Sequence, residues 1–343
     1  MIYVEMRSLS IDKDSSPLAI TMGDPSGINS EILLKTYLRI KNHKNMNFFL
    51  ICDPEWIKKS KKLFKIDVPV NILSKKLILK KDKLNIFPLK NKIYFQIGKP
   101  DKRNNEAIIE SIDTAYNLVK EKKISGIVTL PIYKKNLMKK IPSFLGHTEY
   151  FAKKDRSESL MILLSKNLKV ATITTHIPLS KVSKSLTTKK ILKKLKILDD
   201  SLINDFNIKN PKIAVSSLNP HSGEEGSIGK EEVKVINPSI QEFKKLGKEI
   251  EGPLPADTLF YKKNLKKFDA RICMYHDQAL IPIKTIDFYG SINFTAGLSF
   301  VRTSPDHGTA FNLAGKNKAN PKSLINAIEQ ATFISENRKK NEL

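Results

Sequence analysis

The chain contains six histidines, and five of them lie in polar turns that also carry Gly, Pro or Asp. These five are His147, His176, His221, His276 and His307. Histidines that served only as core side chains would not gather in such turns. Neutral imidazole is the commonest protein ligand for zinc and neighbouring transition metals, so these turns are the first place to expect chemistry.

Three of the histidines, His176, His221 and His276, come directly after the apolar runs 168–174, 212–216 and 270–274, respectively. If these runs are parallel strands, their carboxyl ends meet at one edge of a sheet, where three imidazoles could converge. Three histidines with an open coordination position form a catalytic divalent-metal site. The alternative is that each one is an ordinary loop residue hydrogen-bonded to nearby carbonyls.

Two carboxylates, Asp257 and Asp277, lie in the turns Pro-Ala-Asp-Thr and His-Asp-Gln. A carboxylate there could take part in proton transfer. Equally, it could cap a helix or orient a neighbouring histidine.

An early turn at 22–28 (Met-Gly-Asp-Pro-Ser-Gly-Ile) follows an apolar run. Its glycines would let an anion approach the N-terminus of the following helix. The turn lacks the GxGxxG fingerprint and the Walker lysine, so an ordinary tight turn is the generic expectation. Any dinucleotide that this chain binds must therefore bind in a non-Rossmann manner.

The elements that would position these residues alternate along the chain, which predicts the α/β class. Short apolar runs are expected as strands at 18–21, 47–51 and 126–130, besides the three runs above. Helical spacing of apolar residues is found at 30–38, 55–64, 105–121 and 189–198. The last of these, with lysines between Ile191, Leu192, Leu195 and Leu198, is expected to be a surface helix and not a binding element.

The composition is that of a globular protein, and 343 residues exceed what one core usually holds, so two domains are expected. The net charge of +25 admits a nucleic-acid-binding protein as an alternative class. However, only seven of the 60 basic residues are Arg, and the lysines are scattered in pairs such as Lys153-Lys154. We therefore expect a solvated surface, no nucleic-acid partner and some general attraction for anionic substrates.

The two cysteines, Cys52 and Cys273, form no CxxC pair, which disfavours a disulfide framework and fits a reducing cytoplasm. Residues 1–10 have no apolar core of a signal peptide, and no run approaches the ~18 apolar residues of a membrane span. We expect a cytoplasmic protein with no membrane partner.

Seven motifs, in the same order, resemble those of the 4-hydroxythreonine-4-phosphate dehydrogenase family of vitamin B6 synthesis, over about residues 17–330. They are ITMGDPSG at 20–27, LGHTE at 145–149, TTHIPL at 174–179, LNPHSGE at 218–224, GPLPADT at 252–258, YHDQ at 275–278 and RTSPDHGT at 302–309.

Residues 307–321 also resemble the adenosine-binding loop of isocitrate and isopropylmalate dehydrogenases. This resemblance implies two α/β domains that flank a cleft. It places a first, discontinuous domain at 1–125 plus 300–343 and a second domain, with the metal and substrate site, at 126–299. It also makes His307, Gly308, Thr309 and Asn320 contacts of the cofactor, NAD or NADP.

Carried over by motif, the family resemblance implies a role for each group of residues. The metal ligands are His176, His221 and His276, and the metal is one zinc, magnesium or cobalt ion per site. The substrate contacts are His147, Thr148, Lys284, Asn293 and Arg302, and the candidates for proton transfer are Asp257, Asp277 and Lys284.

The implied reaction is the oxidation of 4-phosphooxy-L-threonine to 2-amino-3-oxo-4-phosphooxybutanoate, which decarboxylates to 3-amino-2-oxopropyl phosphate. The resemblance further implies a homodimer with a metal site shared across its interface. One arrangement takes His276 from one subunit and His176 and His221 from the other. The nearest alternative substrates are threonate and erythronate 4-phosphate, and a phosphate acyltransferase on a similar fold is a more distant alternative.

Three motifs depart from the family pattern. The usual Gly-Ile-Gly-Pro-Glu reads Gly-Ile-Asn-Ser-Glu at 27–31, and Pro-Ile-Asn-Lys reads Pro-Ile-Tyr-Lys at 131–134. Residues 295–300 read Thr-Ala-Gly-Leu-Ser-Phe in place of Thr-Leu-Gly-Leu-Pro-Phe, which could loosen packing near Arg302. None of these changes removes an expected ligand or substrate contact.

Overall fold

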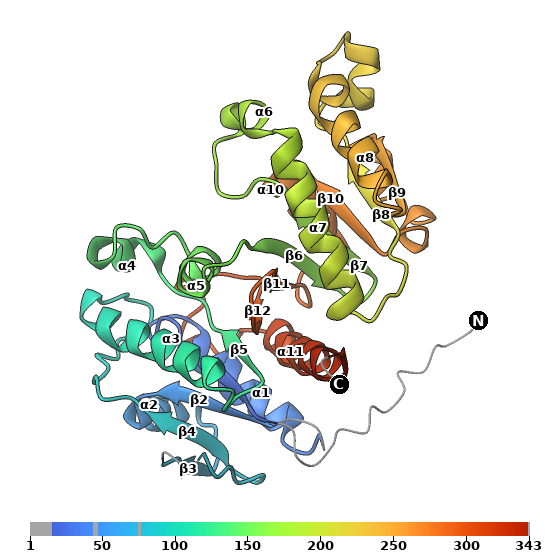
Figure 1. Ribbon diagram of the computed structural model, residues 1–343. Helices are drawn as coiled ribbons and strands as arrows, with labels where there is room; N and C mark the ends of the chain where they lie inside the picture. The colour runs from blue at the N-terminus through green and yellow to red at the C-terminus, as the bar shows by residue number, and fades with distance from the viewer. Residues whose placement is uncertain (1–15, 44–46, 75–76, 342–343) are drawn as a thin grey trace. The chain divides into compact units, whose positions relative to one another are not determined.

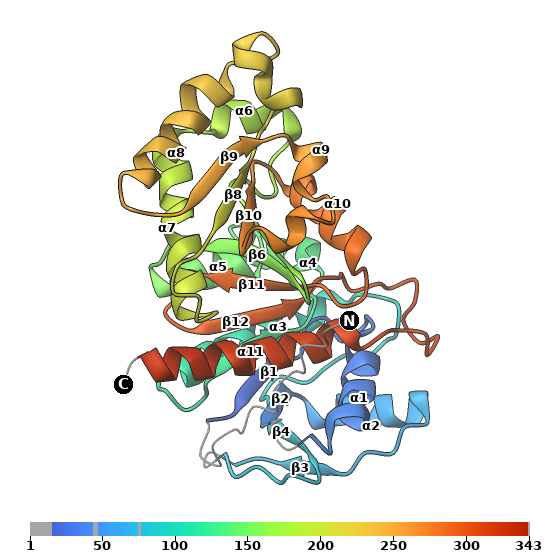
Figure 2. The same ribbon diagram turned by 90° about the vertical axis from the view of Figure 1, so that its right-hand side faces the viewer.

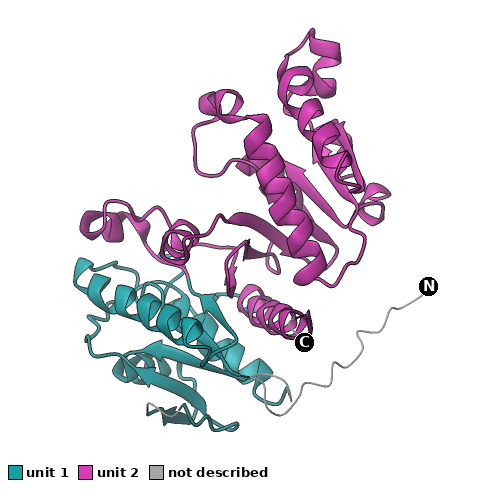
Figure 3. Cartoon of the chain, viewed as in Figure 1, with its two compact units in different colours: residues 1–130, 309–321 teal, residues 131–308, 322–343 magenta. Residues whose placement is uncertain are grey.

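The computed structural model describes residues 16–43, 47–74 and 77–341. The N-terminal residues 1–10, on which the expectation about export rests, lie outside these ranges. The chain divides into two compact units (Figure 3). Unit 1 comprises Met1–Leu130 and Thr309–Pro321, and unit 2 comprises Pro131–Gly308 and Lys322–Leu343.

Unit 1 contains a parallel sheet with the strand order β3-β4-β2-β1-β5 (Figure 1). Its strands are β1 Leu18–Thr21, β2 Phe48–Cys52, β3 Val70–Ile72, β4 Leu84–Pro88 and β5 Gly126–Thr129, and its helices are α1 Asn29–Ile40, α2 Pro54–Phe64 and α3 Asn105–Lys120. Strands β1, β2 and β5 are buried along their whole length, as continuous apolar runs in a parallel sheet should be. Helix α2 begins where Asp53 accepts a hydrogen bond from the amide of Glu55, with Pro54 in its first turn.

Unit 2 contains a mixed sheet with the order β12-β11-β6-β7-β10-β8-β9. Its strands are β6 Leu160–Ser165, β7 Leu168–Thr172, β8 Ile213–Ser216, β9 Ile250–Leu254, β10 Ala270–Cys273, β11 Ile292–Ala296 and β12 Val301–Pro305. The α-helices are α4 Lys134–Lys140, α5 His147–Asp155, α6 Val182–Ser185, α7 Thr188–Asn204, α8 Asn237–Lys244, α9 Ala256–Leu259, α10 His276–Ile286 and α11 Lys322–Asn341. Strands β7, β10, β8 and β9 are mutually parallel, whereas β12, β11, β6 and β7 pair antiparallel.

The helices of unit 2 cover both faces of its sheet. Figure 2 shows α7 and α8 on one side of the strands and α9 and α10 on the other. Helix α10 buries Ala279 and Ile283 against Met161, Leu163 and Val170 of β6 and β7. This packing fixes the N-terminus of α10, and with it His276, above the ends of the parallel strands.

The expected α/β class is confirmed, and each expected strand and helix is present. The largest difference is at the helix expected over 189–198, which extends to Asn204 as α7. The two units divide the chain differently from the expected domains, because residues 300–308 and 322–343 belong to unit 2. Helix α11 is tied to that unit by a hydrogen bond from Thr303 to the carbonyl of Ala327 and by the ion pair between Arg338 and Asp205.

Cys52 and Cys273 are buried free thiols, in accord with the expectation that they form no disulfide. Across the described residues, no helix is long and apolar enough to cross a membrane.

Candidate functional site

A cavity of about 590 Å³ in unit 2 contains most of the expected site residues. We call it the histidine pocket. Its charged, polar and imidazole-bearing side chains are Lys134, His147, Thr148, Glu149, Ser159, Thr172, Thr175, His176, Lys194, His276, Lys284, Asn293, Arg302, Asp306 and His307. The lining residues come from the loops after β5, β7, β10 and β12, from the adjoining helices, and from the strands β6, β7, β11 and β12 themselves, which supply Thr172, Asn293 and Arg302.

One end of the pocket is formed by His176 and His276, whose ring centroids lie 5.7 Å apart. They are brought together because β7 and β10 are parallel neighbours, with Thr172 paired to Cys273. Each ring also meets a carboxylate. Nδ1 of His276 lies 2.7 Å from Oδ1 of Asp277, and Nδ1 of His176 lies 3.5 Å from Oε1 of Glu149.

This contact with His176 is the largest cause of the lowered pKa of Glu149, which keeps that carboxylate charged. A carboxylate on one ring nitrogen leaves the other nitrogen to bind a metal, and metal-ligating histidines commonly have this arrangement. The donor chemistry at this end of the pocket therefore suits a divalent ion. Even so, no group of three His, Cys, Asp or Glu side chains within the described ranges lies close enough to hold a metal.

His221 does not line the histidine pocket, although it follows β8, the neighbour of β10. It begins a run of five residues, 221–225, with positive φ angles between 40° and 79°. Four of the five are not glycine, and each such residue costs about 1–3 kcal/mol of strain. The run is supported by Glu232, whose Oε1 accepts hydrogen bonds from the amides of Leu218 and Asn219, both at 2.8 Å.

The other end of the pocket is cationic. Arg302 is 3% exposed and donates hydrogen bonds to Oγ1 of Thr295 at 3.0 Å and of Thr148 at 3.3 Å. Burial lowers the pKa of Arg302 to about 10, so it stays charged at neutral pH. Burial, with Arg302 and Lys134 nearby, holds the pKa of His147 well below its usual range, so this imidazole is neutral.

Several buried polar atoms of residues that line the pocket have no hydrogen-bond partner in the described part of the chain. They are Nε2 of His147, Oδ1 of Asn293, Oε2 of Glu149 and Nε2 of His307. Buried polar atoms are rarely left unsatisfied in a protein, and a shared location suggests a missing bound group. The histidine pocket is thus built to hold a polar ligand beside Arg302.

Lys284, an expected substrate contact and a candidate for proton transfer, lines the pocket. Its ammonium lies 2.9 Å from Oδ2 of Asp306 and 3.1 Å from Oγ of Ser291, and it also donates to the carbonyl of Asp306. These three acceptors account for all three N–H bonds of the ammonium. Lys284 is therefore fully engaged by these acceptors, with Asp306 as its ion-pair partner.

The other two candidates for proton transfer lie outside the pocket lining. Asp257 is an exposed residue of α9, and the side chain of Asp277 is 71% exposed beside His276. The carboxylates that do line the pocket, Glu149 and Asp306, were not selected from the sequence. Each lies within a family motif, Glu149 next to Thr148 and Asp306 next to His307. These positions beside expected site residues could have indicated a role in the site.

Lys194 also lines the pocket, although the expectation was a surface helix without a binding role. The helix itself is present as part of α7. Lys194 is half-buried and donates to the carbonyl of Ser159, and burial lowers its pKa. The sequence could not single out Lys194, because α7 contains several lysines and their spacing does not show which one faces a pocket.

The expected cofactor contacts fall into both units. His307 and Gly308 line the histidine pocket in unit 2, whereas Thr309 and Asn320 belong to the segment Thr309–Pro321 of unit 1. The early turn at 22–28 is also in unit 1. There Oδ1 of Asp24 accepts a hydrogen bond from the amide of Ser26 at 2.9 Å, and burial raises the pKa of Asp24 to about 6.

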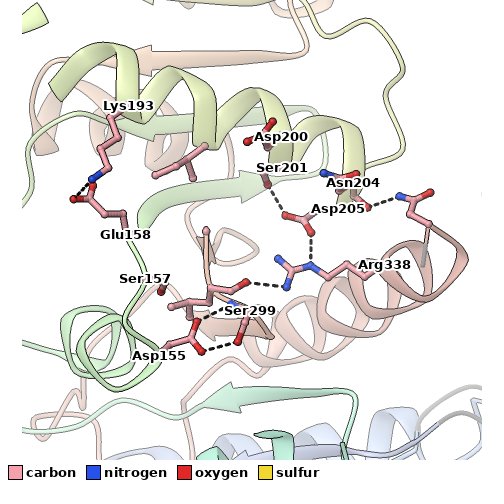
Figure 4. A pocket seen from close by; sticks show the side chains of 14 residues that line it. Asp155, Ser157, Glu158, Lys193, Asp200, Ser201, Asn204, Asp205, Ser299 and Arg338 are labelled. Atoms are coloured by element: carbon pink, nitrogen blue, oxygen red, sulfur yellow. Dashed lines mark hydrogen bonds and ion pairs between the residues drawn. The ribbon is translucent and has the colours of Figure 1, made fainter. Parts of the chain in front are cut away.

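A second cavity of unit 2, of about 610 Å³, is lined by α7, by the C-terminal ends of α5 and α11 and by the loop 297–299 (Figure 4). Most of its carboxylates form hydrogen bonds or ion pairs within unit 2. Asp155 accepts hydrogen bonds from Ser299, Glu158 forms an ion pair with Lys193, and Asp205 forms one with Arg338. It contains none of the expected site residues. The histidine pocket is accordingly the better candidate for a substrate site.

Comparison with known proteins gives one family. Residues 44–331 match the family of the pyridoxal phosphate biosynthetic protein PdxA. A 4-hydroxythreonine-4-phosphate dehydrogenase from Sulfurihydrogenibium sp. is 40% identical over 94% of this chain and 99% of its own.

Solved structures agree. The 4-hydroxythreonine-4-phosphate dehydrogenase of Klebsiella pneumoniae superposes with a TM-score of 0.84 at 31% identity, over 95% of this chain and 99% of that one. The enzyme of the same name from Burkholderia phymatum gives 0.79 at 28% identity, over 93% and 98%. This chain therefore belongs to the PdxA family, whose named members are 4-hydroxythreonine-4-phosphate dehydrogenases.

Proposed function

We propose that the protein oxidises 4-phosphooxy-L-threonine with NAD or NADP, in a reaction that requires one divalent metal ion per site. The observation that carries the proposal is the histidine pocket, where two carboxylate-backed imidazoles share a cavity with a buried arginine and unsatisfied polar atoms. The names of the relatives supply the substrate class and the oxidoreductase class.

The cationic end would hold the charged groups of the substrate. Arg302 offers a planar fork that suits a phosphate or carboxylate. Lys284, whose N–H bonds are taken by Asp306 and Ser291, would contact the substrate only by exchanging one of these partners. Asn293 and the neutral His147 supply further polar atoms that fix the orientation of the substrate. Because Arg302 is almost fully buried, its charge acts in an environment that screens it less than water would.

The other end would hold the metal through His176 and His276, with Asp277 and Glu149 orienting the rings. A divalent ion bound there supplies Lewis-acid chemistry that lowers the pKa of the substrate hydroxyl. Zinc, magnesium and cobalt are the candidate ions. Asp277 would orient the ring of His276, and Lys284 is engaged by Asp306, so neither is our first choice for the proton acceptor. Asp257 remains a candidate.

The third ligand, His221, would come from the partner subunit of a homodimer. We propose that one subunit supplies both His176 and His276, because these rings approach one another within one chain. The arrangement that takes His276 from the second subunit stays the alternative. Exposed apolar side chains support an interface near both segments: Ile177 and Leu179 beside His176, and Ile228 and Val233 beyond His221.

The nicotinamide cofactor would bind without a Rossmann fingerprint, through His307, Gly308, Thr309 and Asn320. The oxidised product, 2-amino-3-oxo-4-phosphooxybutanoate, would lose carbon dioxide to give 3-amino-2-oxopropyl phosphate. A cytoplasmic location is part of the proposal and is supported by the two free, buried thiols.

The test is the rate of NADH or NADPH formation with 4-phosphooxy-L-threonine and with threonate 4-phosphate, each with and without a chelator. We expect turnover of the first substrate that chelation abolishes and metal restores. Equal or faster turnover of threonate 4-phosphate would transfer the proposal to that substrate. Absence of any reduced nicotinamide, with metal present, would contradict it.

A further inference from the structure

The segment Thr309–Pro321 lies nearly two hundred residues beyond the rest of unit 1, yet it packs within that unit. It contains turns in place of helix or strand, and Ala310 and Asn317 have φ angles of 45° and 56°. A backbone of this kind keeps one conformation only when surrounding residues hold it there. Two groups of contacts hold this segment, one from the turn before α1 and one from α1 itself.

The first support is the turn before α1. The amide of Ile28 donates to the carbonyl of Thr309 at 3.0 Å, and the amide of Gly98 holds the turn by donating to the carbonyl of Ser26 at 2.7 Å. A Cβ atom on Gly27 would lie 2.6 Å from the carbonyl oxygen of Thr309. Only glycine allows so close an approach.

The second support is an ion pair one turn further along the helix. Glu31 is fully buried, and its Oε1 lies 2.6 Å from the amide of Ala319 and 2.7 Å from the ammonium of Lys35. Lys35 also donates to the carbonyls of Asn317 at 3.0 Å and Ala319 at 3.1 Å. The ammonium has no N–H left for an anion, so it anchors the segment and does not bind a ligand.

An ion pair made only to stabilise α1 would not need to be buried. Surface pairs of this spacing stabilise a helix by a few tenths of a kcal/mol without desolvation. Burying the carboxylate of Glu31 is costly, and its Oε2 has no hydrogen-bond partner among the described residues. Its Oε1 accepts from the amide of Ala319, and Lys35 donates to the carbonyls of Asn317 and Ala319, so three contacts of the pair fix the end of the segment. The ion pair of Glu31 and Lys35 therefore fixes the backbone conformation of residues 317–319.

We infer that Gly27, Ile28, Glu31 and Lys35 form a clamp that positions Thr309–Pro321 to receive the adenosine half of the dinucleotide. The inference rests on the proposed function. A loop already held in its binding conformation avoids the entropic cost of ordering on association. Loss of the clamp should accordingly weaken dinucleotide binding and leave the phosphorylated substrate, which binds among residues of unit 2, largely unaffected.

The test is the double substitution Glu31→Gln with Lys35→Met, which removes both charges and nearly preserves volume, so that no buried charge is left unpaired. Calorimetry would measure binding of ADP-ribose and of NADH to the metal-free protein. We expect both affinities to fall by about tenfold or more, as for loss of preorganisation. The KM for NAD or NADP should rise in parallel, while that for 4-phosphooxy-L-threonine changes less than about twofold.

The matched control is Glu55→Gln with Lys58→Met, an exposed pair in α2 of the same unit, which should leave every value unchanged. Unchanged ADP-ribose affinity in a folded clamp variant would overturn the inference. Equal loss of affinity for substrate and dinucleotide would also overturn it, because that pattern indicates general loosening. If the clamp variant does not fold, Gly27→Ala tests the contact between the turn before α1 and Thr309. The affinity for ADP-ribose and NADH should again fall, while the KM for 4-phosphooxy-L-threonine changes little.

Failure of the proposed function would give a different pattern. A wild-type protein that binds neither ADP-ribose nor NADH would contradict the nicotinamide assignment itself, and the clamp with it. Wild-type binding that the clamp variant retains would overturn the clamp alone.

Discussion

Replacement of Arg302 by lysine would keep the charge of the cationic end but remove its fork. In wild type the guanidinium donates from Nη1 to Oγ1 of both Thr295 and Thr148, and in the proposed site its planar fork would bind the substrate anion. A hydrogen bond to a charged group contributes about 1.5–3 kcal/mol, so one lost bond corresponds to a fall of about 10- to 150-fold in kcat/KM. We expect Arg302→Lys to show a loss in this range at pH 7.

The same variant should acquire a pH dependence that wild type lacks. Burial lowers the pKa of Arg302 to about 10. The same burial would lower the pKa of a lysine at this position below its ordinary value of about 10.4. The lysine would lose its proton, and with it the bound anion, as the pH rises through that lowered pKa. The assay is kcat/KM for 4-phosphooxy-L-threonine from pH 6.5 to 9.

The exposed Arg156 provides the control, since Arg156→Lys should leave both the value and its pH profile unchanged. Wild-type kcat/KM in Arg302→Lys would refute the assignment of Arg302 as an anion ligand. A large loss that stays constant up to pH 9 would refute the reasoning about burial, because it would require the new lysine to keep an ordinary pKa.

Three further predictions follow from other contacts. His221→Ala and His276→Ala, each inactive, should regain up to about half of wild-type activity after subunits are exchanged, because a mixed two-fold dimer contains one intact site. Arg338→Met should lower the free energy of unfolding by about 3 kcal/mol in urea titrations, since it leaves buried Asp205 without its cation. Asp24 has a pKa raised from 3.8 to about 6, so its contribution to stability is present below pH 3.8 and lost as pH rises through 6. Asp24→Asn should therefore be more stable than wild type at pH 7 by about 3 kcal/mol, at 1.36 kcal/mol per pH unit.

Each of these three predictions has a control or a result that would contradict it. Proven subunit exchange without recovered activity would exclude a shared metal site. For Arg338, the exposed pair of Lys193 and Glu158 gives the control, and Lys193→Met should cost less than about 1 kcal/mol. Equal pH dependence of unfolding in wild type and Asp24→Asn between pH 4 and 7 would show that Asp24 does not carry the effect.

The sequence was sufficient to predict the elements that deliver the site. Apolar runs before His176 and His276 predicted strands, and β7 and β10 are parallel neighbours that bring the two rings together. The alternation of runs and helices also predicted the α/β class. These features follow from local hydrophobic patterns, which are readable without tertiary information.

Features that depend on distant contacts could not be predicted in this way. The positive φ angles that begin at His221 occur at residues such as Ser222 and Glu224, which give no local signal for a left-handed backbone. The position of α11 in unit 2 depends on Arg338 finding Asp205 across 133 positions of sequence. The pairing of Lys284 with Asp306 likewise arises only in the folded chain.

The central claim is that one substrate molecule reaches from the histidine pair to Arg302 within the histidine pocket. The most direct measurement is the ³¹P NMR signal of bound 4-phosphooxy-L-threonine in the presence of Mn²⁺, which relaxes nuclei close to it. We predict strong broadening in wild type that disappears in the double variant His176→Ala with His276→Ala, while phosphate binding itself persists. An unbroadened signal from substrate bound to wild-type protein that also holds Mn²⁺ would contradict the claim.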